Sequence, residues 1–470
     1  MKTHKLRFGF ACNSSSVSSL ILVKPNTDHK ADKIWTKIED KRTFFANIMY
    51  AQEGCDKDKL DFINKLCETN LTDDNYDYCI KNYISTERGA WDTFFFPRDK
   101  TGKLNEEFAK EFLAYSDKYD ISWVSNEDNC CDDAYEIASS HSMLGLNLLR
   151  YFPAGIARKD KDYWTIFSPE NGYKVRLSFD FNSVAPEKST IPELIDIKLT
   201  DYCPYECTFC YQGSTKEGQH VNKENFKGIV DQLYKYGVFE IALGGGEPTL
   251  HPDFDEIIDY INKKNIVVNI TTRNSAWIKK YIDELFDGYG NDLNYKPKIK
   301  SVAISTEDIK IIDQIDSYID AQCGKRRKWN VFPSDIRKCI QFQYIVGVND
   351  KLEEILLKCV LNQYRVTLLG YKTTNRGSLL RPRKEEWMSV VKKLNWGGSY
   401  IGIDTVLAKE CEGIMSKEFD RLLLEKHEGR FSCYIDAVSY KIGPSSFCAP
   451  ENMMPFTDLK ENFKVITDKS

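Results

Sequence analysis

Short apolar runs alternate with amphipathic stretches from about residue 191 to residue 381. The short runs are typical of buried strands, and the longer stretches, in which apolar residues recur every three or four positions, are typical of helices. We predict strands at residues 195–199, 239–243, 266–271, 302–305, 340–346 and 366–369. Helices are predicted between them, over residues 222–236, 253–264, 307–321 and 351–362. This order favours a parallel sheet that right-handed crossovers curl into a partial barrel.

The flanking segments are less regular, and we predict a further domain on each side of the barrel. Before residue 190, apparent hairpins at 8–23 and 163–181 enclose several helical stretches, and a polar stretch then predicts a linker. Later strands are predicted at residues 401–407, 431–435 and 440–442. The predicted fold class is α/β, a partial (β/α)6 TIM-like barrel with an α+β N-terminal domain and a small α/β C-terminal extension. The predicted domains are residues 1–190, 191–381 and 382–470.

The composition is that of a globular protein with a mild net charge. The chain has 470 residues, is 42% hydrophobic and carries a formal net charge of -5. This charge argues against a dedicated nucleic-acid binder, and we find no apolar run long enough to span a bilayer. The N-terminal residues lack the apolar core of a secretion signal, so we expect a cytoplasmic protein. Fifteen cysteines are many for that compartment, which suggests metal or cluster ligation for some of them.

Three cysteines follow the first predicted strand on one short loop. Cys203, Cys207 and Cys210 have the spacing C-x3-C-x2-C. Three thiolates on such a loop bind three corners of a cubane iron–sulfur cluster and leave the fourth iron without a protein ligand. On the cysteines alone, a zinc site completed by a distant Cys or His stays open as an alternative.

A glycine-rich sequence ends the second predicted strand. Residues 244–248 read Gly-Gly-Gly-Glu-Pro. Glycines at a strand end allow a ligand to approach the backbone closely, and a carboxylate there receives an ammonium group. Alone, this sequence is an ordinary turn between a strand and a helix. Its position one strand after the cysteines places both motifs at the same end of a parallel sheet, where ligands bind.

Together the two motifs resemble those of the radical SAM enzymes, in which the residue before the third cysteine is aromatic, here Phe209. The resemblance covers about residues 192–380. It implies that the three cysteines hold a [4Fe-4S] cluster whose open iron binds S-adenosyl-L-methionine (SAM). It further implies that one electron, from a donor of the flavodoxin or ferredoxin type, cleaves SAM to a 5'-deoxyadenosyl radical that abstracts a hydrogen atom from a substrate.

The resemblance also implies SAM-binding residues at the strand ends. The glycines and Glu247 are expected to meet the methionyl amine, and Phe209 is expected near the adenine. Ser305 is the strongest candidate for a polar contact to SAM, with helix capping as its alternative role. The predicted SAM-binding residues are Phe209, Gly244, Gly245, Gly246, Glu247, Pro248, Ser305, Gln343 and Leu369.

The C-terminal cysteines follow a second pattern. Cys433 and Cys448 have the spacing C-x9-G-x4-C, which resembles the opening of the SPASM and twitch auxiliary-cluster domains. No cysteine follows Cys448, so a second cluster would have to recruit Cys411 or an N-terminal cysteine such as those of the pair at 130–131. We therefore interpret this region as a degenerate, twitch-like hairpin with two buried thiols.

The substrate stays open at this stage. The twitch-like tail suggests a peptide or protein, and a nucleotide or other small metabolite is the second possibility. The N-terminal domain is expected to recognise the substrate. The alternative outside enzymes is a non-enzymatic iron–sulfur or zinc-binding module, which explains the cysteines but leaves the glycine-rich strand end without a role.

Overall fold

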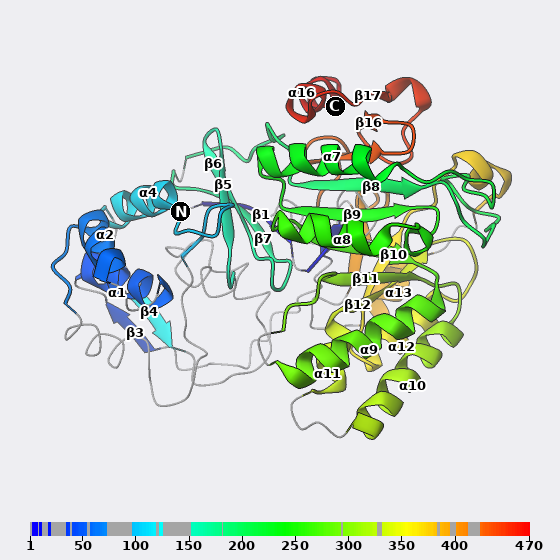
Figure 1. The fold of residues 1–470 in the computed structure, drawn as a ribbon, viewed down its shortest axis with the longest axis horizontal. Helices are drawn as coiled ribbons and strands as arrows, with labels where there is room; N and C mark the ends of the chain where they lie inside the picture. The colour runs from blue at the N-terminus through cyan, green and yellow to red at the C-terminus, as the bar shows by residue number, and fades with distance from the viewer. Residues whose placement is uncertain are drawn as a thin grey trace. The chain divides into compact units, whose positions relative to one another are not determined.

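The computed structural model divides into two compact units (Figure 1). One unit holds residues 1–9 and 23–186, and the other holds residues 10–22 and 187–470. Within them the structure describes residues 2–7, 9–11, 17–19, 34–37, 40–53, 57–72, 96–118, 122–125, 152–180, 182–292, 295–326, 331–382, 386–394, 401–411 and 424–470. The division into three domains expected from the sequence stays a prediction.

The larger unit is built on one long sheet whose central strands are parallel. Six of these strands follow one another in the chain and in the sheet, each pairing in parallel with the next. They are β8 (Leu194–Thr200), β9 (Glu240–Gly245), β10 (Val267–Thr272), β11 (Ser301–Ser305), β12 (Ile340–Ile345) and β13 (Arg365–Leu369). They match the six predicted strands, because near-continuous apolar runs are what strands buried on both faces require. The predicted α/β class with a parallel sheet is confirmed.

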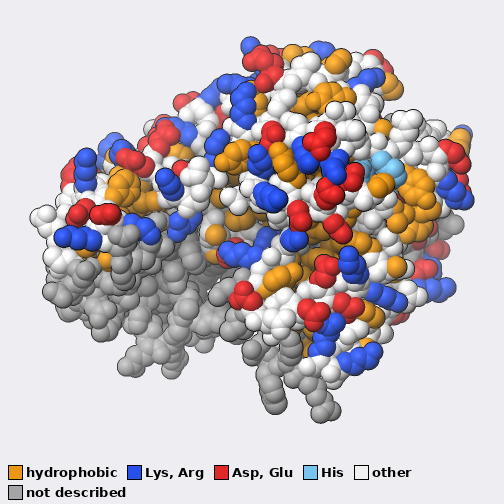
Figure 2. Space-filling model, in the orientation of Figure 1, with side chains coloured by type: hydrophobic (Ala, Val, Ile, Leu, Met, Phe, Trp, Pro, Cys, Tyr) orange, Lys and Arg blue, Asp and Glu red, His pale blue; other side chains and the backbone are white. Residues whose placement is uncertain are grey.

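Helices connect the parallel strands and cover the sheet (Figure 1). They are α7 (Lys223–Tyr236), α8 (Phe254–Lys263), α9 (Ser275–Asn291), α10 (Ile309–Arg326), α11 (Pro333–Lys338), α12 (Leu352–Leu361) and α13 (Trp387–Leu394). Their apolar faces join the strands in one core, as Phe226 and Ile229 of α7 do. Over α7 and α8 the outer surface carries both basic and acidic side chains (Figure 2). Some of them form ion pairs, such as Lys223 with Glu256 at 2.7 Å.

The C-terminal strands extend this sheet at both edges. β14 (Ile401–Asp404) pairs in parallel with β13, and β15 (Ser432–Asp436) pairs in parallel with β8. Among the described residues the parallel run therefore has eight strands, two more than the predicted barrel core. The strand predicted at 401–407 ends at Asp404, because that side chain caps the short helix α14 (Thr405–Ala408).

Antiparallel strands and one helix complete the described part of the larger unit. β16 (Lys441–Gly443) pairs with β15, and β17 (Met454–Pro455) pairs with β16. On the other edge, β2 (Val17–Ser19) pairs with β14. The chain ends in α16 (Leu459–Lys469), which Figure 1 draws in red. In the part of the chain that the structure describes, no helix has both the length and the apolarity that a membrane crossing requires.

The smaller unit is a mixed α+β arrangement. Its four-stranded antiparallel sheet has the order β1-β7-β6-β5, and a strand pair and three described helices accompany it. The elements are β1 (Lys2–Arg7), β3 (Ile34–Lys37), β4 (Ser122–Ser125), β5 (Ile156–Asp160), β6 (Tyr163–Phe167), β7 (Lys174–Ser178), α1 (Lys41–Glu53), α2 (Lys57–Cys67) and α4 (Glu106–Ser116).

One of the two predicted N-terminal hairpins is confirmed, and most of the other lies outside the described residues. β6 and β7 form the hairpin predicted over 163–181. Of the hairpin predicted over 8–23, the structure describes only residues 9–11 and 17–19. The described strand β2 pairs with β14, and β1, which precedes the predicted hairpin, pairs with β7.

Candidate functional site

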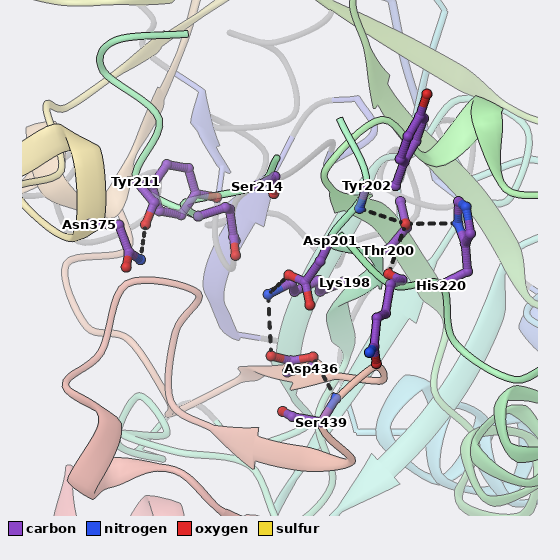
Figure 3. A network of polar contacts seen from close by, with 12 residues as sticks. Lys198, Thr200, Asp201, Tyr202, Tyr211, Ser214, His220, Asn375, Asp436 and Ser439 are labelled. Atoms are coloured by element: carbon purple, nitrogen blue, oxygen red, sulfur yellow. Dashed lines mark hydrogen bonds and ion pairs between the residues drawn. The ribbon is translucent and has the colours of Figure 1, made fainter. Parts of the chain in front are cut away.

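The cysteine loop, residues 201–220, leaves the carboxyl end of β8 and folds back on itself. The backbone N–H of Cys203 donates to the carbonyl of Thr215 at 2.8 Å. The hydroxyl of Thr200 accepts from the backbone N–H of Tyr202 and is hydrogen-bonded to the ring of His220, each at 2.9 Å (Figure 3). These bonds tie the two ends of the loop together, so the three cysteines lie on a segment whose base is fixed.

Charged side chains hold the base of the same loop. Lys198, which is 8% exposed, forms ion pairs with Asp201 and with Asp436, the latter at 3.4 Å (Figure 3). Asp436 ends β15, the strand beside β8, and accepts from the backbone N–H of Ser439 at 3.0 Å. The added C-terminal strand therefore contributes directly to the base of the cysteine loop, a role that the sequence analysis missed.

A segment after β13 holds the cysteine loop from another side. Arg376, in the short helix η4 (Asn375–Leu379), donates to the carbonyl of Cys207 at 3.0 Å and to that of Ser214 at 2.8 Å. Asn375 donates to the carbonyl of Tyr211 at 2.7 Å (Figure 3). Sequence reasoning missed these contacts as well, because Asn375 and Arg376 belong to no motif and their partners lie far away in the chain.

The glycine-rich strand end packs directly against the cysteine loop. The N–H groups of Gly246 and Glu247 donate to the carbonyls of Thr200 and Tyr202 at 2.7 and 2.8 Å. A Cβ at Gly246 would lie 2.1 Å from the Tyr202 carbonyl oxygen, and Gly245 has a φ of +104°. These glycines are required because the backbone of the cysteine loop passes through the space that a side chain would fill.

Glu247 links two strand ends through a buried carboxylate. The residue is 2% exposed. Its Oε1 accepts from the hydroxyls of Thr249 and Thr272, each at 2.6 Å, and its Oε2 accepts from the backbone N–H of Arg273 at 2.9 Å. Burial raises the pKa of Glu247, although these hydrogen bonds partly offset the shift. Oε2 keeps room for another donor, so the predicted contact with an ammonium group fits the geometry.

Arg273 places a positive charge beside one of the predicted ligands. Its guanidinium lies 2.7 Å from the sulfur of Cys207 and 2.5 Å from a carboxylate oxygen of Glu307. Burial alone would lower the pKa of Arg273, but the negative charges of Cys207 and Glu307 raise it above its usual value. The sequence analysis did not assign this contact of Arg273.

The three thiols fit an iron–sulfur cluster better than a single metal ion. All three are half-buried. Burial raises the pKa of Cys203, and the negative charges of Glu247, Cys207 and Cys210 raise it further, so the groups lie within electrostatic range of one another. Among the described residues, no three His, Cys, Asp or Glu side chains form a group that could hold one metal ion. A cubane cluster does not require the three thiols to converge on one ion, because each thiolate binds a different iron atom.

The remaining predicted SAM-binding residues lie at neighbouring strand ends. Ser305 of β11 is the register partner of Gln343 of β12. Leu369 ends β13, and its carbonyl accepts from the N–H of Val346 at 2.9 Å. Phe209 is half-buried on the cysteine loop. Of the other predicted positions, Gly244 pairs with Lys198 across β8 and β9, and Pro248 is buried at the start of the short helix η3 (Pro248–Leu250). Their contacts with SAM stay a prediction.

The C-terminal cysteines lie at separate points of the structure. Cys433 is fully buried in β15, and burial raises the pKa of its thiol. The thiol of Cys411 donates to the carbonyl of Leu407 at 3.5 Å, and the sulfur of Cys448 lies 3.4 Å from that of Met453. The hairpin of β15 and β16 is present, and no cysteine group able to hold a metal ion occurs among the residues described. The pair at 130–131 lies outside the described residues.

A sequence model of the Radical SAM superfamily matches residues 197–322. The chain contains a radical SAM domain. This domain includes both the cysteine loop and the glycine-rich strand end. Radical SAM domains bind a [4Fe-4S] cluster and SAM, which are the cofactors predicted from the sequence.

Curated relatives match the radical SAM domain over short segments. The mycofactocin maturase MftC of Mycobacterium tuberculosis (strain CDC 1551 / Oshkosh) is 34% identical over 82 residues, 17% of this chain and 21% of that protein. The subtilosin biosynthesis protein AlbA of Bacillus subtilis is 34% identical over 113 residues, 24% of this chain and 23% of that protein. A probable GTP 3',8-cyclase of Methanococcus maripaludis is 31% identical over 93 residues, 19% of this chain and 31% of that protein. The chain thus matches about a fifth to a third of the length of these relatives.

Solved structures resemble this chain over a larger share at low identity. SuiB of Streptococcus suis bound to S-adenosylmethionine has a TM-score of 0.47 and 12% identity, covering 67% of this chain and 88% of that chain. The enzyme anSMEcpe with bound AdoMet has a TM-score of 0.38 and 12% identity, covering 59% of this chain and 81% of that chain.

Proposed function

We propose that this protein is a radical SAM enzyme that holds a [4Fe-4S] cluster on Cys203, Cys207 and Cys210. The observation that carries the proposal is the direct backbone pairing of the glycine-rich strand end with the cysteine loop, in which the N–H of Glu247 donates to the carbonyl of Tyr202 at 2.8 Å. Because of this pairing the two motifs form one site. When bound, the cluster and SAM supply the one-electron cleavage that starts hydrogen abstraction in this superfamily.

The chain's own residues hold and orient these groups. Arg376 and Asn375 fix the cysteine loop through its carbonyls. Arg273 donates to the Cys207 sulfur, and hydrogen bonds to ligand sulfurs are a known means of setting a cluster's potential. Glu247 offers its second carboxylate oxygen to the methionyl amine, and the ends of β11, β12 and β13 offer the remaining contacts to SAM.

A peptide is the first substrate class to test. Relatives of the radical SAM domain include proteins named PqqA peptide cyclase, mycofactocin maturase and bacteriocin subtilosin biosynthesis protein. The relatives named GTP 3',8-cyclase favour a nucleotide as the second class. Each of these relatives matches only part of the chain. We therefore expect that the residues outside the matched segment, in the smaller unit and the C-terminal strands, determine which substrate binds.

Anaerobic reconstitution tests the function. With iron, sulfide and a chemical reductant, the protein is expected to hold about four irons per chain and to release 5'-deoxyadenosine from SAM, measured by liquid chromatography. A flavodoxin or ferredoxin should replace the chemical reductant. Stoichiometric zinc without iron, or a full cluster that never yields 5'-deoxyadenosine, would refute the proposal and favour a metal-binding module.

Replacing Arg273 by leucine is expected to lower the midpoint potential of the cluster. The variant removes a positive charge and a hydrogen bond from the Cys207 sulfur, both of which favour the reduced and more negative cluster. The shift should be on the order of 1 kcal/mol, which is tens of millivolts. Redox titration followed by EPR measures it.

Two controls accompany the Arg273 variant. Arg273→Lys keeps the charge and should shift the potential less. Arg337→Leu removes an arginine that pairs with Asp316 at 2.8 Å, away from the cysteine loop, and should leave the potential unchanged. A potential that stays at the wild-type value in Arg273→Leu means that this side chain does not act on the cluster.

The C-terminal cysteines are expected to hold no second cluster. Cys433 is buried, Cys448 contacts a methionine, and neither has further ligands among the described residues. The double variant Cys433→Ala with Cys448→Ala should therefore keep the iron content near one cubane. Iron analysis measures this, and seven to eight irons per chain in the wild type, about twice one cubane, would contradict it.

A further inference from the structure

Lys372, in the loop after β13, is a buried cation that forms no ion pair or hydrogen bond in the part of the chain that the structure describes. It is 9% exposed. Its ammonium nitrogen lies 4.6 Å from the ring centre of Tyr211 and 4.7 Å from that of Phe447. Two aromatic faces stabilise a cation, but they leave all three N–H donors of the ammonium unused.

The charges of three carboxylates act on this ammonium group. They come from Asp196 in β8, which is 2% exposed, Asp404 at the end of β14, which is 0% exposed, and Glu428 before β15. One oxygen of each is buried and has no hydrogen-bond partner among the described residues, namely Oδ2, Oδ2 and Oε2 respectively. We call Lys372 and these three residues the buried charge cluster.

Hydrogen bonds place two of the acids near the lysine and near each other. Asp404 accepts from the backbone N–H of Gly370, two residues before Lys372, at 3.0 Å, and Glu428 accepts from the hydroxyl of Thr405, the residue after Asp404. Burial raises the pKa of Asp196 to about 7 and that of Glu428 to about 8, and the charge of Lys372 offsets only part of each rise. Asp404 and Asp196 raise the pKa of Glu428 further. Burial alone would lower the pKa of Lys372, yet the acidic groups around it, Tyr211 and the three carboxylates, raise it.

The cluster lies next to the cysteine loop, because Lys372 contacts the ring of Tyr211. β8 and β14 are separated by five strands in the sheet order, so only a curved sheet brings Asp196 and Asp404 to the same lysine. Tyr211 directly follows Cys210 in the chain, and its hydroxyl lies 3.2 Å from that of Ser446. Its carbonyl is held by Asn375 (Figure 3). The buried charge cluster is therefore adjacent to the proposed catalytic loop.

Three carboxylic acids act on one amine, so the cluster has more acidic than basic groups, and Lys372 donates to none of the three open oxygens. A network that serves only the fold normally satisfies its buried oxygens, because each unpaired one is costly. These three carboxylates also form no group that could hold a metal ion. An organic cation with several N–H donors satisfies both the charge and the open oxygens.

We propose that the buried charge cluster binds a protonated amine of the substrate and so fixes that substrate beside the cysteine loop. This inference rests on the proposed function and narrows its substrate class to amine-bearing molecules. Lysine side chains and amino termini of peptides belong to this class. An unmodified nucleoside triphosphate does not.

Binding of n-propylammonium to the reconstituted full-length protein tests the proposal, with 1-propanol as the uncharged probe of similar size. Ligand-observed NMR titration measures both. We expect n-propylammonium to bind at least tenfold more tightly than 1-propanol, because a charge-assisted hydrogen bond is lost in the alcohol. Asp196→Asn and Glu428→Gln should each weaken amine binding roughly tenfold. Asp231→Asn, an exposed acid of α7 that pairs with Lys264, should leave it unchanged.

Equal affinity for the two probes, or no measurable amine binding, overturns the proposal, and so does amine binding that both cluster variants leave intact. If the variants fail to fold, the comparison of the two probes on the wild-type protein still decides. The same preparations are assayed for iron and for 5'-deoxyadenosine. Loss of those signals counts against the proposed function, whereas normal SAM cleavage without amine selectivity counts against the buried charge cluster alone.

Discussion

Replacing Cys203, Cys207 and Cys210 together by alanine is expected to abolish reductive cleavage of SAM. The variant removes every protein ligand of the proposed cluster, so both the iron and its visible absorbance should be lost. Iron analysis and chromatography of 5'-deoxyadenosine measure the two losses. The backbone of the loop should persist, because its carbonyls remain bonded to Arg376 and Asn375.

Cys323→Ala is the matched control for the cysteine variant. Cys323 is a half-buried thiol of α10 with no role in the proposed site. This control should keep full iron and wild-type cleavage. A triple variant that still cleaves SAM would show that the cluster is held elsewhere, and the assignment of the cysteine loop would be wrong.

Replacing Gly246 by alanine is expected to displace the cysteine loop and to remove most of the iron. The added Cβ would lie 2.1 Å from the carbonyl oxygen of Tyr202, a backbone atom that moves only with the loop. We expect a loss of about 1–3 kcal/mol in the free energy of unfolding, measured by chemical denaturation. Iron content after reconstitution gives the second measurement.

Gly228→Ala supplies the comparison for Gly246→Ala. Gly228 lies within α7, and a Cβ there meets no atom within 4 Å. Alanine in a helix interior should stabilise the protein by about 0.5–1 kcal/mol and leave iron unchanged. If the two alanine variants behave alike, the close approach of the two loops is not a constraint on the site.

The regular part of the fold was predictable because its pattern is local. Strands β8 to β13 are apolar runs buried on both faces, and each is followed by an amphipathic helix. The periodicity of the sequence is therefore sufficient to locate these strands and helices. The placement of β14 and β15 was not predictable in this way. Both are recognisable as strands, but β15 pairs with β8 across more than two hundred residues, and no local pattern encodes such a partner.

The same distinction applies to the candidate site. The cysteines and glycines were found because their spacing follows from the chemistry of a cluster and from close backbone contact. Arg273, Asn375 and Arg376 were missed as contacts of the cysteine loop, since a single side chain that reaches a distant atom leaves no periodic trace in the sequence. The buried charge cluster was missed for the same reason, because each of its members lies on a different strand or loop.

The bond between Arg376 and the Cys207 carbonyl has a consequence for synthesis of the protein. Arg376 follows Cys207 by 169 residues. At a translation rate of roughly 5–20 residues per second, the cysteines leave the ribosome about 10–30 seconds before the segment that fixes their loop. β15, which holds the loop's base, follows later still. Cluster insertion is therefore expected only after residues 375–436 have left the ribosome, and until then the nascent chain must keep three thiols reduced.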